Sequence, residues 1–429
     1  MMALVSFAAD VVQITYSGSQ VKIVNKIKDV KISCDGAHVT IDNPVTDREI
    51  TFMLKGQSDN GNLLYNGVHK ATFVLSGLTL STEDGACMHF RCGKKIKIKA
   101  EKGTVNTLTD GLDTLHKACV HIKDNGKISG KGILNLNARA DGSKGIKCGG
   151  NLIIEDVTLT VTTTGNYRSE GHPDFMMMGQ PQGEGGFPPM PEGFSPDSMM
   201  MGGFPMMGPP MGGPGGGGGG GRHFYEGTAK AVKVGDTLTV NSGVIKIYTQ
   251  SGGAEGLEGK SGVIINGGDV FIKAQDDAIN SNGKIIFNGG KTVAWSRGND
   301  AVDSNYRGEG AITITGGEVY AISQLGPPDE GFDCDFSPMI MTGGTAFSMG
   351  GSMGFNVTSP KKTDSCPPYL VMQAMNLQEG KTLQVLDEDG SSVFSYRIPF
   401  SMQQSFGFVS CSKMLKDKVY HISIVPAKL

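Results

Sequence analysis

Pairs of polar residues three positions apart recur about every 23 residues through the central part of the chain. The first pairs consist of lysines, and the later pairs consist of carboxylate and amide residues. The lysine ammonium group can bind the carboxylates of an acidic polymer, whereas carboxylate and amide oxygens are ligands that Ca²⁺ prefers. This chemistry requires a fold in which successive pairs lie side by side. The pairs are Lys144 and Lys147, Lys230 and Lys233, Glu255 and Glu258, Asp277 and Asn280, and Asp300 and Asp303.

The acidic pairs form a candidate calcium site. In a stack of parallel strands, equivalent residues on neighbouring strands lie about 4.8 Å apart, so like charges in one column repel each other. A calcium ion would relieve this repulsion. The alternative is a solvated acidic face in which Lys230 and Lys233 form salt bridges to Glu255 and Glu258. The candidate ligands are Asp276, Asp277, Asn299, Asp300 and Asp303, with Glu255 and Glu258 as a second group.

The lysine pairs form a candidate site for a uronate chain. Their predicted spacing of about 4.8 Å is close to the length of one sugar residue, so each lysine could pair with a successive carboxylate. Aromatic residues at comparable strand positions could stack on sugar rings, but packing between neighbouring turns would explain them equally well. The candidate binding residues are Lys144, Lys147, Lys230, Lys233, Tyr248, Trp295 and Tyr320.

Short strands with glycine or asparagine at their corners position these residues. Alternating apolar and polar runs at 283–290 and 310–317 end in Gly-Gly, and further alternating runs follow them. This pattern predicts two or three strands in each repeat. The repeat is too short for a propeller blade, and it lacks the leucine-rich consensus. The sequence therefore predicts an all-β fold, a right-handed parallel β-helix in which stacking supplies the core.

An apolar residue followed by a polar one serves to align the repeats. This alignment places Arg91 and Lys123 in one column with Lys147, and it continues through the later polar pairs. The apolar anchors are Phe90, Ile122, Ile146, Val232, Leu257, Ile279 and Val302.

Both ends of the chain and one internal segment depart from the repeat. Residues 1–80 are predicted to be a β-rich lead-in or cap, residues 81–365 the β-helix, and residues 366–429 a small antiparallel β cap with a hairpin at 388–390. Residues 166–226 are rich in Met, Gly and Pro and contain too few apolar side chains for a core, so a disordered insertion is predicted there. Its methionines could bind a soft metal ion, but a flexible linker is the simpler interpretation.

Composition excludes several classes of function. The net charge is −3, no block of Lys or Arg indicates nucleic-acid binding, and no apolar run is long enough to cross a membrane. The segment MMALVSFAAD is similar to the end of a secretory signal, which predicts a secreted or cell-surface protein. Among the eight cysteines, Cys87 and Cys119 lie in matching sequence and are expected to stack in the core. Disulfides, or a zinc site with Cys92, His89 and His121, are the alternatives.

Several segments resemble one bacterial family, the "carbohydrate-binding domain-containing" proteins. The run KGTVNTLTDG at 102–111 is similar to the family's GTxNTLTDG segment, and DDAIN at 276–280 and NDAVD at 299–303 are similar to its DDGIN-like corners. The resemblance implies a right-handed parallel β-helix, extracellular placement, bound calcium and affinity for an acidic plant polysaccharide such as polygalacturonate. It implies no hydrolytic or lyase activity. Alanine stands at Ala278 and Ala301, where the family usually has glycine.

Two other functional classes stay open at this point. A calcium-dependent pectate lyase would need a base beside the acidic cluster, and Arg297 and Arg307 are the candidates. A glycoside hydrolase would need two facing carboxylates, which a single row does not supply. A surface adhesin or structural solenoid is the remaining alternative. No Ser-His-Asp, P-loop or HExxH pattern is recognisable in the sequence. Non-catalytic carbohydrate binding is therefore the predicted function, with no prediction of oligomeric state.

Overall fold

The computed structural model describes residues 10–113, 116–166, 228–335, 337–354 and 356–426. All of these belong to one compact unit, Met1–Arg168 with Glu226–Leu429. The signal-like segment 1–9 and all but the first residue of the predicted insertion 166–226 lie outside the described residues. Within the described ranges the regular secondary structure is all strand, and no helix could span a membrane.

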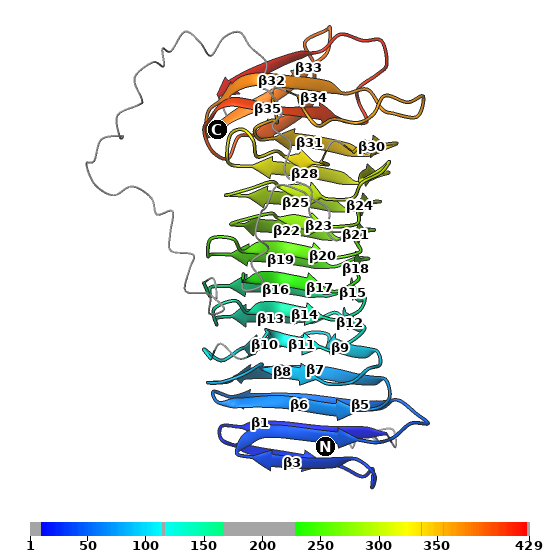
Figure 1. The fold of residues 1–429 in the computed structure, drawn as a ribbon, viewed down its shortest axis with the longest axis vertical. Helices are drawn as coiled ribbons and strands as arrows, with labels where there is room; N and C mark the ends of the chain where they lie inside the picture. The colour runs from blue at the N-terminus through cyan, green and yellow to red at the C-terminus, as the bar shows by residue number, and fades with distance from the viewer. Residues whose placement is uncertain (1–9, 114–115, 167–227, 336, 355, 427–429) are drawn as a thin grey trace, which may run out of the picture. The chain divides into compact units, whose positions relative to one another are not determined.

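One sheet of eleven strands forms a continuous parallel ladder after its first, antiparallel pair. Figure 1 shows its central strands stacked one above another. The strands in spatial order are β3 (Lys31–Asp35), β4 (Ala37–Asn43), β6 (Gly61–Gly67), β8 (Met88–Phe90), β11 (Ala118–Ile122), β14 (Lys144–Cys148), β17 (Lys230–Val234), β20 (Glu255–Gly259), β23 (Ile279–Ser281), β26 (Val302–Ser304) and β29 (Phe332–Asp333).

Two further stacks complete each turn, and β7 joins them because it pairs with a strand of both. The short stack contains β9 (Ile96–Ala100), β12 (Gly126–Ser129), β15 (Leu152–Glu155), β18 (Thr237–Val240), β21 (Gly262–Ile265), β24 (Lys284–Phe287), β27 (Ile312–Ile314) and β30 (Ile340–Met341). The long stack contains β2 (Gln20–Val24), β1 (Val11–Ser17), β5 (Ile50–Ser58), β7 (Ala71–Ser81), β10 (Val105–Thr109), β13 (Ile133–Ala138), β16 (Thr158–Thr163), β19 (Val244–Thr249), β22 (Asp269–Ala274), β25 (Lys291–Ser296), β28 (Glu318–Ser323) and β31 (Thr345–Met349).

Antiparallel strands cover the C-terminal end of this solenoid. β35 (Met402–Ser410) pairs with β31 and with β32 (Leu370–Leu377). A separate three-stranded sheet contains β34 (Ser392–Arg397), β33 (Lys381–Leu386) and β36 (His421–Pro426), and β33 and β34 form the predicted hairpin. The predicted parallel β-helix with a small antiparallel cap is therefore confirmed. Parallel stacking begins before residue 81, since β4 pairs with β6 and β5 with β7.

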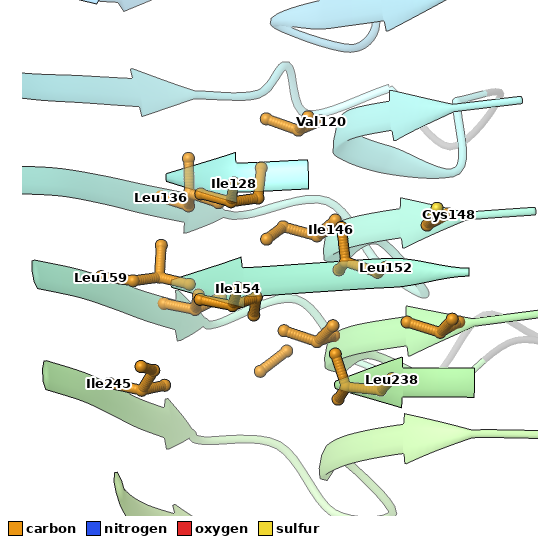
Figure 2. Close-up of a cluster of buried hydrophobic side chains, with 14 of the residues drawn as sticks. Val120, Ile128, Leu136, Ile146, Cys148, Leu152, Ile154, Leu159, Leu238 and Ile245 are labelled. Carbon is orange, nitrogen blue, oxygen red and sulfur yellow. The ribbon is translucent and has the colours of Figure 1, made fainter. Parts of the chain in front are cut away.

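The core consists of one apolar side chain or more from each strand of every turn. In Figure 2, Ile146 of β14, Ile154 of β15 and Leu159 of β16 come from one turn, and all three are fully buried. Burial of each such side chain contributes about 1.5–3 kcal/mol. A single turn is too thin to enclose these side chains, so the turns above and below shield them from water.

Glycine is required where the chain bends between the short and long stacks. Gly290 has a φ of +75°, and a Cβ atom there would lie 2.4 Å from the carbonyl oxygen of Gly268 on the previous turn. Only glycine combines this conformation with such a close approach. Beside these bends, Asn288 donates to Asn266 and Asn266 donates to Asn241, at 2.8 and 2.9 Å. The stacked amides fix the corner of each turn.

The predicted alignment of the first two anchors is wrong by two residues. Phe90 and Ile122 align with Cys148, not with Ile146. His89 and His121, rather than Arg91 and Lys123, therefore share a column with Lys147. The error arose because side chains alternate with a period of two, so a shift of two residues preserves the apolar pattern.

Candidate carbohydrate-binding surface

The outward face of the eleven-stranded sheet carries a continuous column of polar side chains. Ile279 pairs directly with Val302, so the repeats that define the column lie on neighbouring strands, as predicted. A second column joins Lys144, Lys230 and Glu255. Rungs in such a sheet lie about 4.8 Å apart. The main column, in order, is His89, His121, Lys147, Lys233, Glu258, Asn280, Asp303 and Asp333.

The lysines in the middle of this face are engaged with the protein itself. Lys144 is 6% exposed, and its Nζ donates to the carbonyl of Gly142 at 2.6 Å. Lys230 Nζ lies 2.6 Å from Glu255 Oε1 and 3.0 Å from Glu258 Oε2. Lys233 Nζ lies 3.3 Å from the same Glu258 oxygen. The salt-bridge alternative therefore describes these residues, and any ligand would compete with buried ion pairs.

Charge compensation determines the pKa values in this cluster. Burial lowers the pKa of Lys230, but attraction to Glu255 and Glu258 outweighs burial and leaves that pKa raised. Burial raises the pKa of Glu258, but the two lysines outweigh it and leave that pKa lowered. Glu255 has a raised pKa because its burial exceeds the effect of Lys230. The two lysines and the two glutamates therefore balance each other in formal charge.

At the acidic end of the face, Asp277, Asp300 and Asp303 form no ion pair with a lysine or arginine among the described residues. Asp277 and Asp300 are each 4% exposed and Asp303 is 8% exposed. Asn280 Nδ2 donates to Asp277 Oδ2 at 2.7 Å and to Asp303 Oδ2 at 3.0 Å. The backbone N–H of Glu330 donates to Asp300 Oδ1 at 2.5 Å. Asp277 Oδ1 is buried and makes no hydrogen bond within the described part of the chain.

Desolvation and mutual repulsion raise the pKa values of these carboxyl groups. Burial is the larger cause in each case, and neighbouring aspartates add to it. The pKa of Asp303 rises to about 7 and that of Asp300 to about 8. The pKa of Asp277 also rises well above its ordinary value. Asp333, which the sequence analysis missed, extends the column beyond Asp303. Asp333 lies 30 residues after Asp303, and not about 23, so the repeat spacing did not reveal it.

The other predicted metal ligands lie at the edge of this group. Asp276 is half-buried next to Asp277, while the Asn299 backbone carbonyl accepts a bond from Ser323 Oγ at 2.8 Å. Arg297 and Arg307 are exposed. Among the described residues, no three His, Cys, Asp or Glu side chains converge closely enough to hold a metal ion as they stand.

A pocket at the opposite, N-terminal end of the column was not predicted. Its volume is about 400 Å³, and its lining includes His89, Arg91, Lys117 and His121. The two imidazole rings are stacked, with centroids 4.6 Å apart. Burial, followed by the nearby positive charges and His89, lowers the pKa of His121 to about 4, and burial with Arg91 lowers that of His89. Arg91 and Lys117 are the exposed cations of the pocket, and its lining also includes Asp113 and His116, which lie 2.9 Å apart.

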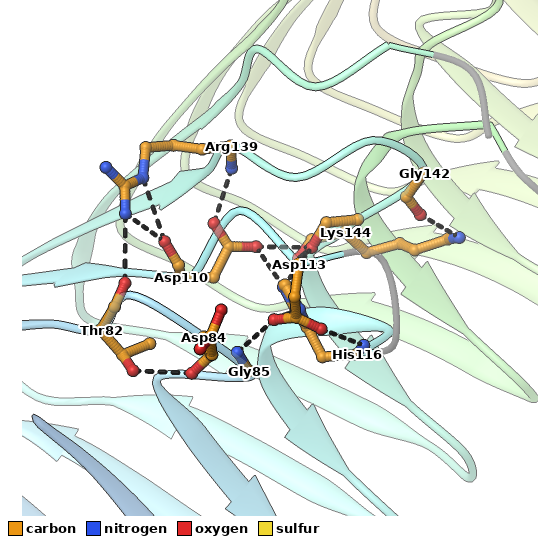
Figure 3. Close-up of polar contacts among 10 residues, drawn as sticks. Thr82, Asp84, Gly85, Asp110, Asp113, His116, Arg139, Gly142 and Lys144 are labelled. Atoms are coloured by element: carbon orange, nitrogen blue, oxygen red, sulfur yellow. Dashed lines mark hydrogen bonds and ion pairs between the residues drawn. The ribbon is translucent and has the colours of Figure 1, made fainter.

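The NTLTDG segment forms part of a buried hydrogen-bond network next to this pocket (Figure 3). Asp110 Oδ2 accepts a bond from Ser143 Oγ at 2.6 Å and lies 2.9 Å from His116 Nε2. The backbone N–H of Arg139 donates to Asp110 Oδ1 at 2.6 Å, and His116 Nδ1 lies 2.9 Å from Asp113. The structure thus brings together a serine, a histidine and an aspartate that no sequence pattern indicated.

This network does not have the geometry of a nucleophilic triad. Ser143 is fully buried, and its hydroxyl proton is directed to Asp110 and not to His116, whose Nε2 lies 3.4 Å away. Burial lowers the pKa of His116, but Asp110 and Asp113 outweigh it and leave that pKa raised. We interpret the network as a structural connection between turns.

Two of the predicted sugar-stacking aromatics are covered by the C-terminal cap. Trp295 lies between Lys273 Nζ, which is 4.0 Å from its ring centroid, and Phe400, whose ring centroid is 5.5 Å away. Tyr320 stacks on Tyr396 at 5.6 Å. Packing therefore accounts for both side chains. Tyr248 differs, because it is 36% exposed.

Cys87 and Cys119 lie in the core, as predicted. Cys87, which directly precedes β8, and Cys119 of β11 are fully buried, and all eight cysteines are free thiols. Cys87 and Cys92 are buried, whereas His89 and His121 alternate to the outward face. The zinc alternative therefore has no support in this arrangement.

Comparisons with known proteins agree with the resemblance. A family model described as "carbohydrate-binding domain-containing protein" matches residues 35–170 and 219–301, just over half of the chain. A protein of Acetivibrio thermocellus with the same description is 27% identical over 151 residues, which are 30% of this chain and 52% of that protein. The match thus spans about half the length of that relative. A solved structure, the gadolinium derivative of a polysaccharide lyase-like protein from C. thermocellum, covers 78% of this chain and 98% of its own at 16% identity and a TM-score of 0.43. This chain belongs to the family of carbohydrate-binding domain-containing proteins.

Proposed function

We propose that the protein binds an acidic polysaccharide such as polygalacturonate without cleaving it, and that the pocket at His89 and His121 holds a carboxylate-bearing sugar. The pocket combines two exposed cations, Arg91 and Lys117, with His89 and His121, whose lowered pKa values keep them neutral at pH 7. Asp113 and His116 also line it, but they are paired with each other at 2.9 Å. Guanidinium and ammonium groups bind carboxylates, and a neutral imidazole can donate to or accept from a sugar hydroxyl. The proposal rests on one observation, a pocket that brings exposed cations and hydrogen-bonding imidazoles together.

In the proposed complex, the main carboxylate contacts lie next to β11 and β8, one and two rungs from Lys147 and two and three rungs from Lys233. Lys230 and Lys233 already neutralise glutamates, and Lys144 donates to a backbone carbonyl. A ligand gains little from a charge that is already paired, since it must first break the existing contact. Arg91 and Lys117 have no salt bridge among the described residues.

Titration with oligogalacturonate tests this site. We expect the double variant Arg91→Ala and Lys117→Ala to bind roughly tenfold more weakly, because two exposed charge contacts contribute about 0.5–2 kcal/mol together. The loss should shrink at high salt, where exposed charges are screened. The control is Lys26→Ala with Lys28→Ala, which removes two exposed lysines from the first turns. Equal affinity of the wild-type protein, the Arg91 and Lys117 variant and the control would refute the proposed pocket.

We further propose that Ca²⁺ binds at the acidic end of the same face, held by Asp277, Asp300 and Asp303. The donor set fits a hard cation, because it consists of carboxylate oxygens. The buried, unpartnered Asp277 Oδ1 and the raised pKa values support an unmet demand for positive charge. A bound ion would supply that charge and would keep the three carboxylates ionised. Calorimetric titration of chelator-treated protein tests this, and the absence of both heat and thermal stabilisation would refute it.

A lyase assay addresses the enzymatic alternative. Incubation with polygalacturonate and calcium, followed by ultraviolet absorbance, detects the unsaturated products of elimination. We expect binding without such products. Product formation that depends on Arg297 or Arg307 would instead favour the lyase.

A further inference from the structure

The outward face of the long stack carries two columns that neither the charged face nor the cap explains. Between them lie buried residues such as Leu108 and Leu136, so both columns point away from the core. They occupy five consecutive strands, β10, β13, β16, β19 and β22, which Figure 1 shows stacked one above another. One column contains Thr107, Asn135, Thr160, Lys246 and Phe271, and the other contains Thr109, Asn137, Thr162, Tyr248 and Lys273.

The first three rungs present uncharged hydrogen-bonding groups. Asn137 Nδ2 donates to Thr109 Oγ1 at 3.1 Å, which uses one of the two N–H donors of that amide. Within the other column, Asn135 Nδ2 lies 3.5 Å from Thr107 Oγ1. Thr160 and Thr162 are half-buried, and their hydroxyls make no hydrogen bond to other described residues. These rungs keep donors and acceptors available for an external ligand.

The last two rungs present an aromatic surface. The rings of Tyr248 and Phe271 have centroids 5.9 Å apart and planes inclined by 48°. Tyr248 is 36% exposed and Phe271 is half-buried. On the following rungs, Trp295 and Tyr320 are covered by Phe400 and Tyr396 of the cap. The aromatic residues of the cap therefore contact the turns that follow Phe271. Contact with the cap does not explain why an aromatic pair stands at Tyr248 and Phe271.

The geometry points to a second glycan track, and we propose that one polysaccharide chain lies along this face. The apolar face of a pyranose ring would stack on Tyr248 and Phe271, while Thr160, Thr162 and the asparagines would bond its neighbours' hydroxyls. Five rungs span about 19 Å, which accommodates several sugar residues. This inference rests on the proposed carbohydrate-binding function, but it uses a different face and uncharged contacts.

The recognised chemistry is the ring face and its hydroxyl groups, which neutral and acidic chains share. Lys273 Nζ is already placed over Trp295, so Lys246 is the one lysine of these two columns that lies exposed without a described partner. Binding along this track should therefore depend little on salt, in contrast to the pocket at Arg91 and Lys117. This difference separates the two sites experimentally.

Isothermal titration of the full chain tests the track, with neutral β-1,4-linked glucan, xylan and mannan oligosaccharides in one arm and oligogalacturonate in the other. We expect Tyr248→Ala to weaken binding about three- to tenfold in at least one arm, and Tyr248→Phe to retain it. Thr160→Val with Thr162→Val should weaken binding by a similar factor, because valine keeps the strand shape and removes the hydroxyl. Thr239→Val, on the short stack, is the matched control.

The outcomes distinguish the two proposals. Wild-type affinity of Tyr248→Ala and of the double threonine variant in every arm, together with a loss for the Arg91 and Lys117 variant, would overturn the track alone. Failure of the wild-type protein to bind any of these glycans would overturn both. A loss in the Tyr248→Ala variant that persists at high salt, with an unchanged unfolding midpoint, supports the track.

Discussion

Two acidic groups on one face of the protein reach opposite electrostatic states. Glu255 and Glu258 lie next to the lysine rungs and have ammonium groups within 2.6–3.3 Å. Asp277, Asp300 and Asp303 lie one and two rungs further along, where the described hydrogen bonds come from amides and backbone N–H groups. Glu258 therefore has a lowered pKa, and Asp300 has one of about 8. In a solenoid, the neighbouring rung determines whether a buried carboxylate is compensated.

Removal of the central lysine should produce the largest effect. We expect Lys230→Met to lower the free energy of unfolding by about 3–5 kcal/mol, because it leaves Glu255 and Glu258 buried without their main counter-charge. Urea denaturation at neutral pH measures this change. The double variant Lys230→Met with Glu255→Met should recover part of the loss. A loss below about 1 kcal/mol for the single variant would show that the cluster is not tightly coupled.

The uncompensated end should make stability fall as pH rises. The folded pKa values of Asp300 and Asp303, about 8 and about 7, exceed the unfolded value of about 3.9. The folded protein therefore retains protons that the unfolded chain releases, so this contribution is complete below about pH 4 and is lost as pH rises through about 8.

We expect a decrease of several kcal/mol between about pH 5 and about pH 8.5 in chelator, since each unit of pKa difference corresponds to about 1.4 kcal/mol. Denaturation at a series of pH values checks it. Asp300→Asn with Asp303→Asn should flatten the profile. An unchanged profile in that variant would place the pH dependence elsewhere.

Calcium should act on the aspartates and not on the glutamates. At pH 8 and saturating calcium, the wild-type free energy of unfolding should rise by about 2–3 kcal/mol if the ion is present at about 100 times its dissociation constant. Thermal unfolding with and without calcium measures the rise. Asp277→Asn with Asp303→Asn should abolish the rise, and Glu258→Gln should keep it. A rise that survives the aspartate substitutions would move the ion away from this cluster.

Lys233 should show the smallest effect of the four. It makes a single ion pair at 3.3 Å with its side chain 21% exposed, so Lys233→Met should cost about 1 kcal/mol or less. Parallel measurement with Lys230→Met checks this ratio. Equal losses for the two lysines would contradict the expectation that Lys230, which is more deeply buried and contacts two glutamates, contributes more to stability.

The sequence analysis predicted the repeat, the anchors from Ile146 onward and the columns that follow from them. It aligned Phe90 and Ile122 correctly with each other but misplaced both relative to the later anchors. Ile122 pairs with Cys148 and not with Ile146, and alternation alone does not distinguish a shift of two residues. The pocket beside His89 and His121 was missed for the same reason. Asp110, His116 and Ser143 are far apart along the chain, so only the stacking of their turns shows that they meet.

The sequence alone determined that short strands alternate between core and solvent, that glycines mark the corners, and that stacked turns place like residues in columns. These properties depend on periodicity and local conformation, which are written in each repeat. The tertiary structure decided which charges are paired and which aromatics are covered. It did so because pairing and covering depend on contacts between different turns and with the cap, and a one-dimensional pattern does not specify them.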